Sequence, residues 1–390
     1  MPRQFHAAPA AAILSAVLLA PAGVSAAADV SINVTAVTGL FYANAEGGGG
    51  TLAMAGYSQV PDDSKITINA REDIGNGWYA GAQLQNRYQL DSGEFTEAGV
   101  LFNAVARAFV GNDLVEFSFG RMSGLTVAGL PYSIYAKLNA NQTYASLAGI
   151  APANITYQPG DLSNAVGFAT RAKRGVFLHG VYSNGDSTQA AGDTEATEGW
   201  SDRRHVAQLS TGWTGEQLKT GIVYSFEMPG NLRNAAGLRD VRRENTHAVH
   251  LIASWDFGGP SVSGILYASR NDWRIGPVPD LASIVGGEQI FGASGKGLES
   301  FALHVSAKYP VGRHTFSAAA GYLKTKWKGE DAAGGENKGS LAMGGGVYYY
   351  DLSKHTRFYA AASWLDGKKL LDNAARLNQA IATAGMSLNF

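Results

Sequence analysis

A small set of basic residues carries the chemistry that this sequence suggests. The stretch from residue 117 to 160 holds no aspartate or glutamate, and its only charges are Arg121 and Lys137. Three more arginines occupy polar positions of nearby alternating segments: Arg71, Arg87 and Arg107. Cations that face no carboxylates raise the local concentration of anions. The set therefore predicts the attraction of anions rather than the making or breaking of bonds.

Residue patterns for catalysis and metal binding are missing from the sequence. His247 and His250 are three positions apart, so on a strand they face opposite sides and cannot share a metal. The segment 292–297 resembles a phosphate-binding loop, but Ile290 stands where its first glycine is needed and Gly297 replaces its Ser or Thr. The chain has no Gly-x-Ser-x-Gly elbow and no cysteine. We expect no enzyme, no cofactor and no metal.

The segments that carry the basic residues alternate between apolar and polar positions. At the end of the chain, Leu388 and Phe390 alternate with Ser387 and Asn389, and the pattern runs back to residue 380 with a single break at Ile381. A period of two is typical of a strand with one apolar and one polar face. In an outer-membrane barrel the apolar face meets lipid and the polar face lines a wet lumen.

The lengths of the connections favour such a barrel. Short connections such as 73–77 alternate with long ones such as 272–297. Bacterial outer-membrane barrels have short turns on the periplasmic rim, long loops on the other rim, and an even number of strands. We find about 17 candidate strands, so one of the segments 154–158 and 164–171 is loop or turn. The sequence predicts an all-β fold, a transmembrane antiparallel β-barrel of 16 strands.

The N-terminus predicts export. Arg3 is the only charge in the first 28 residues, an apolar run extends to Ala20, and Ala26 ends a small-residue cleavage site. We assign residues 1–26 to a signal peptide and 27–390 to the barrel domain. The barrel domain has no apolar run of about 18 residues that could form a transmembrane helix. The net charge is −1 and no basic patch occurs, which argues against a nucleic-acid partner.

Two stretches resemble the general porins of Gram-negative outer membranes. In 64–78 (SKITINAREDIGNGW), the spacing of the acidic pair to the glycines matches the porin stretch SRLGFKGSEDLGGGL. Further on, LFN, FVG and FGR between residues 101 and 121 resemble the porin stretch LFNRQAYVGL…VTLGRQ. The chain departs from the family at Ala104, where a basic residue is frequent, and at Ala70 and Arg71, where a glycine usually follows the basic position.

The resemblance implies a homotrimer of barrels in the outer membrane of a Gram-negative bacterium, reached through the periplasm. It implies that the third long loop, here about 122–155, folds into the lumen as a constriction loop. It also implies that Phe390, in the last strand, is part of the signal read by the barrel-assembly machinery. The other expected partners are the lipid bilayer and lipopolysaccharide.

We expect passive diffusion of small hydrophilic solutes and inorganic ions through a water-filled channel that prefers anions. The predicted constriction residues are the five basic side chains Arg71, Arg87, Arg107, Arg121 and Lys137. Lys65 and Glu116 are predicted to have a secondary place on the lumen wall. The alternative for the arginines is that some of them pair with carboxylates from elsewhere, such as Glu72 or Glu116.

Other functions stay open at this point. A substrate-specific channel would place stacked aromatics along the lumen, for which Tyr348 and Tyr359 are candidates. A lipase or protease embedded in the barrel would need a Ser/His pair on the barrel face. A soluble binding protein is a further alternative. The carboxylates of the outer loops could bind divalent cations together with lipopolysaccharide, or could simply be solvated.

Overall fold

The computed structural model describes residues 28–45, 49–55, 62–127, 132–140, 151–171, 173–186, 204–229, 231–233, 240–272, 295–329, 336–372 and 377–390. The predicted signal peptide, residues 1–26, lies outside the described residues. The described helices are α2 (Ile134–Lys137) and the 3-10 helix η2 (Pro152–Asn154). In the described part of the chain, no helix is long and apolar enough to cross a membrane.

Strands account for most of the described residues. They are β1 (Asp29–Ala45), β2 (Thr51–Met54), β3 (Lys65–Gly75), β4 (Trp78–Arg87), β5 (Val105–Gly111), β6 (Val115–Ser123), β7 (Asp161–Thr170), β8 (Gly175–Asp186), β9 (Arg204–Thr214), β10 (Leu218–Pro229), β11 (Asn231–Arg233), β12 (Asp240–Arg242), β13 (Thr246–Asp256), β14 (Ser261–Asp272), β15 (Leu298–Val311), β16 (His314–Trp327), β17 (Lys338–Asp351), β18 (Thr356–Lys369) and β19 (Asn378–Asn389).

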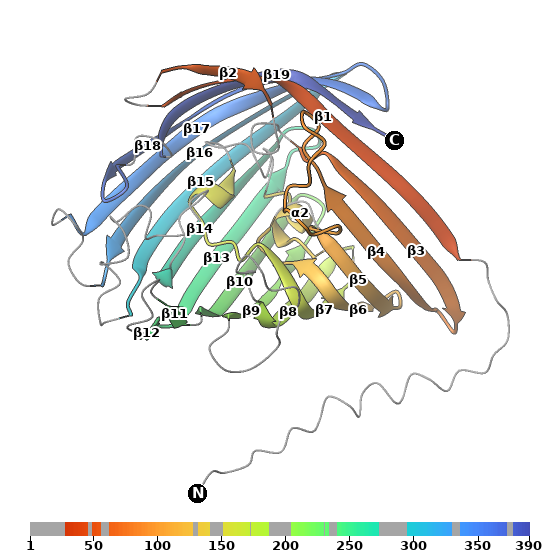
Figure 1. The fold of residues 1–390 in the computed structure, drawn as a ribbon. Coiled ribbons are helices and arrows are strands. Elements are labelled where there is room, and N and C mark those ends of the chain that lie inside the picture. Colours follow the sequence, from red (N-terminus) through yellow and green to blue (C-terminus); the bar gives the residue numbers. More distant parts are fainter. Residues whose placement is uncertain are drawn as a thin grey trace, which may run out of the picture.

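The strands form one large antiparallel sheet that curls into a barrel (Figure 1). Both β2 and β3 pair with β1: β2 pairs with residues 40–43 of β1, and β3 pairs with residues 29–35 of β1. They are therefore two parts of one interrupted strand. β11 and β12 form a separate two-stranded sheet. With β2 and β3 counted together, the described residues form a closed barrel of 16 strands, which confirms the predicted fold. Of the two doubtful segments, 164–171 coincides with β7, whereas 154–158 forms no strand.

The barrel closes where β1 meets β19. Their register runs from Thr35 opposite Asn389 to Ala45 opposite Gln379. The backbones of Val34 and Phe390 exchange two further hydrogen bonds of 2.9 Å. Closure removes free sheet edges, which is essential in lipid because no water is there to satisfy unpaired backbone groups.

The period of two separates an apolar outer face from a largely polar inner face. On β13, Leu251 and Trp255 are exposed on the outside, whereas His250 and Ser254 are buried on the inside. β19 follows the same rule, and its one break in the sequence pattern, Ile381, points inward into a buried apolar cluster. The exposed apolar side chains therefore form the surface that faces lipid.

One rim of the barrel carries short turns and the other carries long connections. The turn between β3 and β4 is formed by Asn76 and Gly77, whose φ angles of 54° and 75° suit these two residue types. The other short turns are 112–114, 171–174, 215–217, 257–260, 312–313 and 352–355. β1 begins and β19 ends at the same rim, so this is the periplasmic rim expected of an outer-membrane barrel.

The described parts of the connection between β6 and β7 lie inside the barrel. α2 buries Ile134 and Tyr135 in a cluster with inward-facing apolar side chains of β8, β10, β13 and β14. The carbonyl oxygen of Leu138 accepts a hydrogen bond from Ser254 on the inner face of β13. In Figure 1, α2 is correspondingly surrounded by strands. This connection includes most of the predicted constriction loop, 122–155.

A second apolar cluster lies inside the barrel against β13 to β18. It joins Ile155 and Tyr157 of the same connection to Met343 and other inward-facing side chains. Leu371, from the connection between β18 and β19, is fully buried in this cluster. The last long connection therefore also folds into the barrel, which the sequence analysis did not predict.

Candidate functional site

Neighbouring strands bring a buried carboxylate and its hydrogen-bond donors together inside the barrel. The register of β4, β5 and β6 places Tyr79 opposite Gly111 and Gly111 opposite Glu116, all on the inner face. One carboxylate oxygen of Glu116 accepts from Arg107 Nη1 at 2.8 Å. The other accepts from the Tyr79 hydroxyl at 3.0 Å and from Nη1 of Arg171, directly after β7, at 2.8 Å.

Two guanidinium groups lie against the ring of Tyr79. The guanidinium carbon of Arg71 is 3.8 Å from the ring centroid, and that of Arg171 is 5.4 Å away. A cation over an aromatic face is attracted by the ring quadrupole, which fixes the direction of a long side chain. We call Arg71, Tyr79, Arg107, Glu116 and Arg171 the arginine cluster. It contains three cations and one carboxylate.

The inward connection closes over this cluster through Tyr132. The Tyr132 hydroxyl donates to Glu116 at 3.1 Å and lies 2.7 Å from the hydroxyl of Ser118. Burial, together with the nearby Glu116 carboxylate, raises the pKa of Tyr132. The hydroxyl therefore keeps its proton and serves as a hydrogen-bond donor, so Glu116 has four donors in all.

A cavity of about 330 Å³ separates the inward connection from the barrel wall at this point. Its lining includes charged and polar side chains of both parts: Arg107, Glu116, Tyr132, Lys137, Arg171 and His179. The ammonium of Lys137, at the end of α2, lies 5.2 Å from the ring centroid of Phe177. Burial, and secondarily the charge of Lys219, lowers the pKa of Lys137. The structure thus brings the predicted residues Arg107, Lys137 and Glu116 to one cavity, with Arg71 beside them.

Arg87 and Lys65 lie opposite each other on β4 and β3, at the strand ends next to the long connections. Arg87 is buried between Asp63, at 3.1 Å, and Asp161, at 2.6 Å. Lys65 pairs with Asp62 at 3.0 Å. These two predicted site residues belong to a group in which carboxylates balance the cations.

Arg121 lies apart from both groups. It follows Phe119 by two positions on β6 and pairs in register with Ala106, which places it on the outward-facing side of the strand. Its guanidinium donates to the carbonyl oxygen of Asn103 and pairs with Glu97 at 2.7 Å. Arg121 therefore holds the connection between β4 and β5 against the barrel and is not part of the arginine cluster.

The expectation that the basic residues face no carboxylates is wrong for Arg87, Arg107 and Arg121. The acid-free stretch 117–160 is bordered by Glu116 on one side and Asp161 on the other. Antiparallel pairing brings Glu116 of β6 against Arg107 of the neighbouring β5, and Asp161 at the start of β7 reaches Arg87 of β4 across β5 and β6. The alternative that named Glu116 as a partner is confirmed for Arg107.

A second buried ion pair, which the sequence analysis missed, fixes the inward connection to the wall. Arg204 makes two hydrogen bonds with Glu227, at 2.9 and 3.0 Å, and a third with the carbonyl oxygen of Pro159 at 2.9 Å. The Tyr157 hydroxyl also donates to Glu227. No local sequence pattern indicates the pairing of Arg204 with Glu227, which follows only from the pairing of β9 with β10 in the barrel.

The histidines fit no metal site in the described part of the chain, where no group of three ligating side chains occurs. His250 is buried on the inner face of β13, whereas His247 is exposed on the outer face, where its Nδ1 lies 2.7 Å from the Tyr224 hydroxyl. The two histidines therefore lie on opposite faces of the strand, as the two-residue period predicts. On the outer surface His314 likewise contacts a tyrosine hydroxyl, that of Tyr348, at 2.8 Å.

Comparison with known proteins gives a consistent result. The sequence profile of the Gram-negative porin family matches residues 10–370. An anion-selective porin from Comamonas acidovorans is similar in structure at 18% identity, with a TM-score of 0.63 over 93% of this chain and 100% of that chain. OmpT of Vibrio cholerae is 13% identical, with a TM-score of 0.58 over 95% of this chain and 100% of that chain. OmpF of Salmonella typhi, solved with daunomycin, is 12% identical, with a TM-score of 0.58 over 93% and 97%.

These structural similarities establish the fold alone, and the curated proteins provide no match. The family profile, by contrast, covers most of the chain, and the closed barrel of 16 strands is the architecture that the porin resemblance implied. The chain belongs to the Gram-negative porin family and forms a channel in the outer membrane.

Proposed function

We propose that the channel is a passive diffusion pore for small hydrophilic solutes and inorganic ions, and that it prefers anions. The observation that carries this proposal is the charge balance of the arginine cluster. Three guanidinium groups, those of Arg71, Arg107 and Arg171, share the single carboxylate of Glu116. That carboxylate already accepts four hydrogen bonds, so little of its charge remains to repel an anion in the lumen.

The excess positive charge lies where a solute can meet it. Arg71 is exposed on the inner face of β3, and the Arg171 side chain is 42% exposed. Charge of one sign in a narrow, water-filled lumen with low-dielectric walls raises the concentration of counter-ions there. Lys137, on the inward connection, adds a further positive charge from the opposite side.

The inward connection supplies the narrowing in this proposal. It packs along the inner faces of β8 to β17 and contacts the arginine cluster through Tyr132, so solutes pass beside this contact, where Arg71 and Arg171 are exposed. We assign the constriction to Arg71, Arg107 and Lys137 among the predicted residues, and add Arg171. Arg87 and Lys65 contribute less because Asp62, Asp63 and Asp161 balance them.

Two other functions find less support. A sugar channel needs stacked aromatics in the lumen, but Tyr348 contacts Phe316 on the outer face, and the Tyr359 hydroxyl is buried against the carbonyl oxygen of Thr38. A barrel hydrolase needs a Ser/His pair on the barrel face, but the exposed His247 and His314 contact tyrosine hydroxyls. Catalysis is not needed for a solute to diffuse through the lumen.

Assembly completes the proposal. We infer a homotrimer, as in the porin family, whose last strand is recognised by the barrel-assembly machinery. The exposed Phe390 ring stacks on His355 with centroids 5.7 Å apart at the periplasmic rim, where such machinery would meet it.

Reversal potentials across a planar bilayer in a KCl gradient test the anion preference. The wild-type channel is expected to show a reversal potential of the sign that results when chloride is more permeant than potassium. Removing two exposed charges, with Arg71→Gln and Arg171→Gln together, should move it towards zero. Arg174→Gln is the control because this exposed arginine lies in the same turn as Arg171 but pairs with Glu216 and not with Glu116 of the arginine cluster. Clear cation preference of the wild type, or equal shifts in both variants, would contradict the proposal. A phospholipid hydrolysis assay separates the channel from a barrel hydrolase.

A further inference from the structure

A basic groove runs along the outer surface of the barrel, across β15, β16, β17 and β18. It has a volume of about 560 Å³ and includes four lysines in its lining: Lys324, Lys326, Lys338 and Lys369. Lys324 and Lys326 alternate with the buried Leu323 and Thr325, so both point away from the lumen. Register places Lys338 directly opposite Lys326. The groove therefore opens to the surroundings of the barrel and not to the channel.

The charge of this groove is strongly one-sided among the described residues. Its lining has one carboxylate, that of Glu299, which pairs with Lys328 at 2.8 Å. Nearby, Lys368 pairs with Asp366 at 2.8 Å. The four groove lysines make no ion pair with a described carboxylate, and Lys324 has only the ring of Tyr322, 6.0 Å away. Unbalanced lysines side by side repel one another, which favours an anionic occupant.

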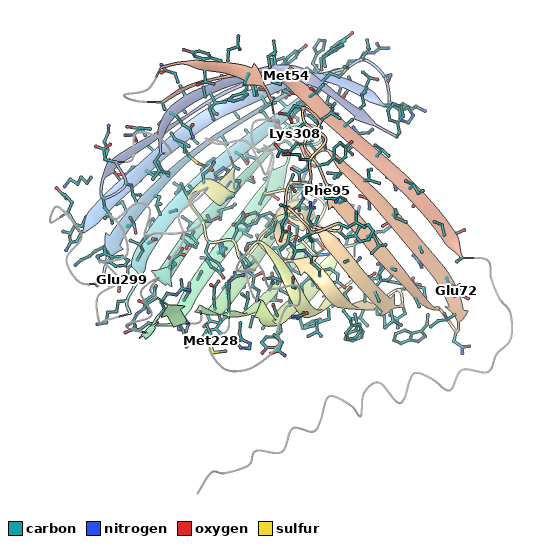
Figure 2. All side chains as sticks on the ribbon, viewed as in Figure 1. Met54, Glu72, Phe95, Met228, Glu299 and Lys308 are labelled. Atoms are coloured by element: carbon teal, nitrogen blue, oxygen red, sulfur yellow. The ribbon has the colours of Figure 1, made fainter. Side chains whose placement is uncertain are left out.

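The position of the groove indicates its height in the membrane. Lys326 lies one residue before the end of β16, Lys338 begins β17 and Lys369 ends β18, all at the rim of long connections that faces away from the periplasm. Glu299, at the start of β15, marks this rim in Figure 2. Towards the middle of the barrel the groove is lined by the exposed rings of Phe301 and Tyr322. Aromatic rings next to cations are typical of the boundary between acyl chains and headgroups.

We propose that this groove binds a phosphate group of the glycolipid that forms the outer leaflet of the membrane. Phosphate is the anion that this leaflet presents at the height of the lysines, next to the acyl chains that the aromatic rings would contact. A lysine near an anionic lipid surface strengthens binding about fivefold. Four lysines around one groove can hold a doubly charged phosphate, and the proposal is independent of the ion preference of the channel.

The test uses the purified, folded protein in detergent, titrated with lipid A that carries both phosphates. The variant replaces the four groove lysines by glutamine (K324Q, K326Q, K338Q and K369Q). It should bind this lipid at least about tenfold more weakly than wild type. Replacement of the same lysines by arginine should keep the binding. The control is K368Q, which removes a lysine of the same rim that already pairs with Asp366 outside the groove lining, and should bind like wild type.

Three results would overturn the proposal. One is equal binding of the lipid by the wild type and the glutamine variant. Another is equal binding of fully dephosphorylated lipid A by the wild type. The third is displacement of the lipid by inorganic phosphate at the same concentration as lipid, which would indicate a site for a soluble anion. Heat-modifiable gel mobility checks that each variant is folded, and unchanged single-channel conductance confirms that the groove lies outside the lumen. If the fourfold variant does not fold, the pairs K324Q/K326Q and K338Q/K369Q replace it.

Discussion

Glu116→Gln should be among the most destabilising single substitutions in the barrel wall. The side chains of Arg107 and Glu116 are only 7% and 6% exposed and lie 2.8 Å apart. Removing one partner of such a buried pair leaves an uncompensated charge, which typically costs about 3–5 kcal/mol of the free energy of unfolding. A glutamine oxygen still accepts up to two hydrogen bonds but carries no charge to balance the guanidinium.

The remaining variants of the arginine cluster should lose stability in a definite order. Arg107→Gln should cost less than Glu116→Gln, because Glu116 keeps its donors Arg171, Tyr79 and Tyr132. Arg171→Gln should cost at most about 1 kcal/mol, because this side chain is 42% exposed and water replaces its partner. The double variant of Arg107 and Glu116 should be more stable than the sum of the two single changes predicts, since no buried charge remains without a partner.

Urea titrations that follow the folded fraction by heat-modifiable gel mobility measure this order. The four variants are compared with wild type at low and high salt. Salt should reduce the effect of Arg171→Gln but leave that of Glu116→Gln almost unchanged, since buried pairs are poorly screened. Equal costs for Glu116→Gln and Arg171→Gln, or strict additivity in the double variant, would refute the reasoning from burial.

Three further predictions concern the channel and its assembly. Because burial lowers the pKa of Lys137, its ammonium loses the proton at a lower pH than an exposed lysine does. Anion preference should therefore decline as the pH rises into the alkaline range. Reversal potentials measured as a function of pH should show this decline in the wild type and not in Lys137→Gln. Arg204→Gln removes the hydrogen bonds that join Glu227 on the barrel wall to the Pro159 carbonyl of the inward connection, so single-channel recordings of the variant should show larger current fluctuations than wild type. A variant current as steady as that of the wild type would argue against an anchoring role. Phe390→Ala should lower the yield of assembled barrel in cells while leaving refolding in detergent near wild type, because the ring is 67% exposed and stabilises little; an equal loss in both assays would contradict a role as an assembly signal.

The strands could be predicted from the sequence because their signal is local. The two-residue period of an extended chain decides which side chains of β13 face lipid. Those that do are Leu251, Ala253 and Trp255, and those that do not are His250 and Ser254. The same rule assigned Arg71 and Arg107 correctly to the inner face and Tyr359 to the lumen side. It also places Arg121 and Tyr348 outside, where the sequence analysis had expected the lumen.

The ion pairs could not be predicted because they depend on which strands are neighbours. Arg171 is 55 positions from Glu116, and Arg204 is 23 from Glu227, with no pattern linking either pair. The absence of acidic residues from 117–160 is a property of the sequence and not of the space around the arginines, where Glu116 and Asp161 lie. The inward course of the last long connection was hidden for a similar reason: Leu370 and Leu371 are two leucines in an otherwise largely polar stretch, and their burial depends on the cluster that they join.

The seam between β1 and β19 constrains how the protein can be made. The hydrogen bond from Thr35 to Asn389 spans 354 positions, and that from Tyr359 to Thr38 spans 321. Until β19 is in place, β1 keeps an unpaired edge that attracts any extended segment, including one from another copy. A chain that is still being synthesised therefore cannot close its barrel, and the polypeptide has to cross the periplasm with the barrel open. The barrel can close only when the last strand is available, both in the cell and on refolding in detergent.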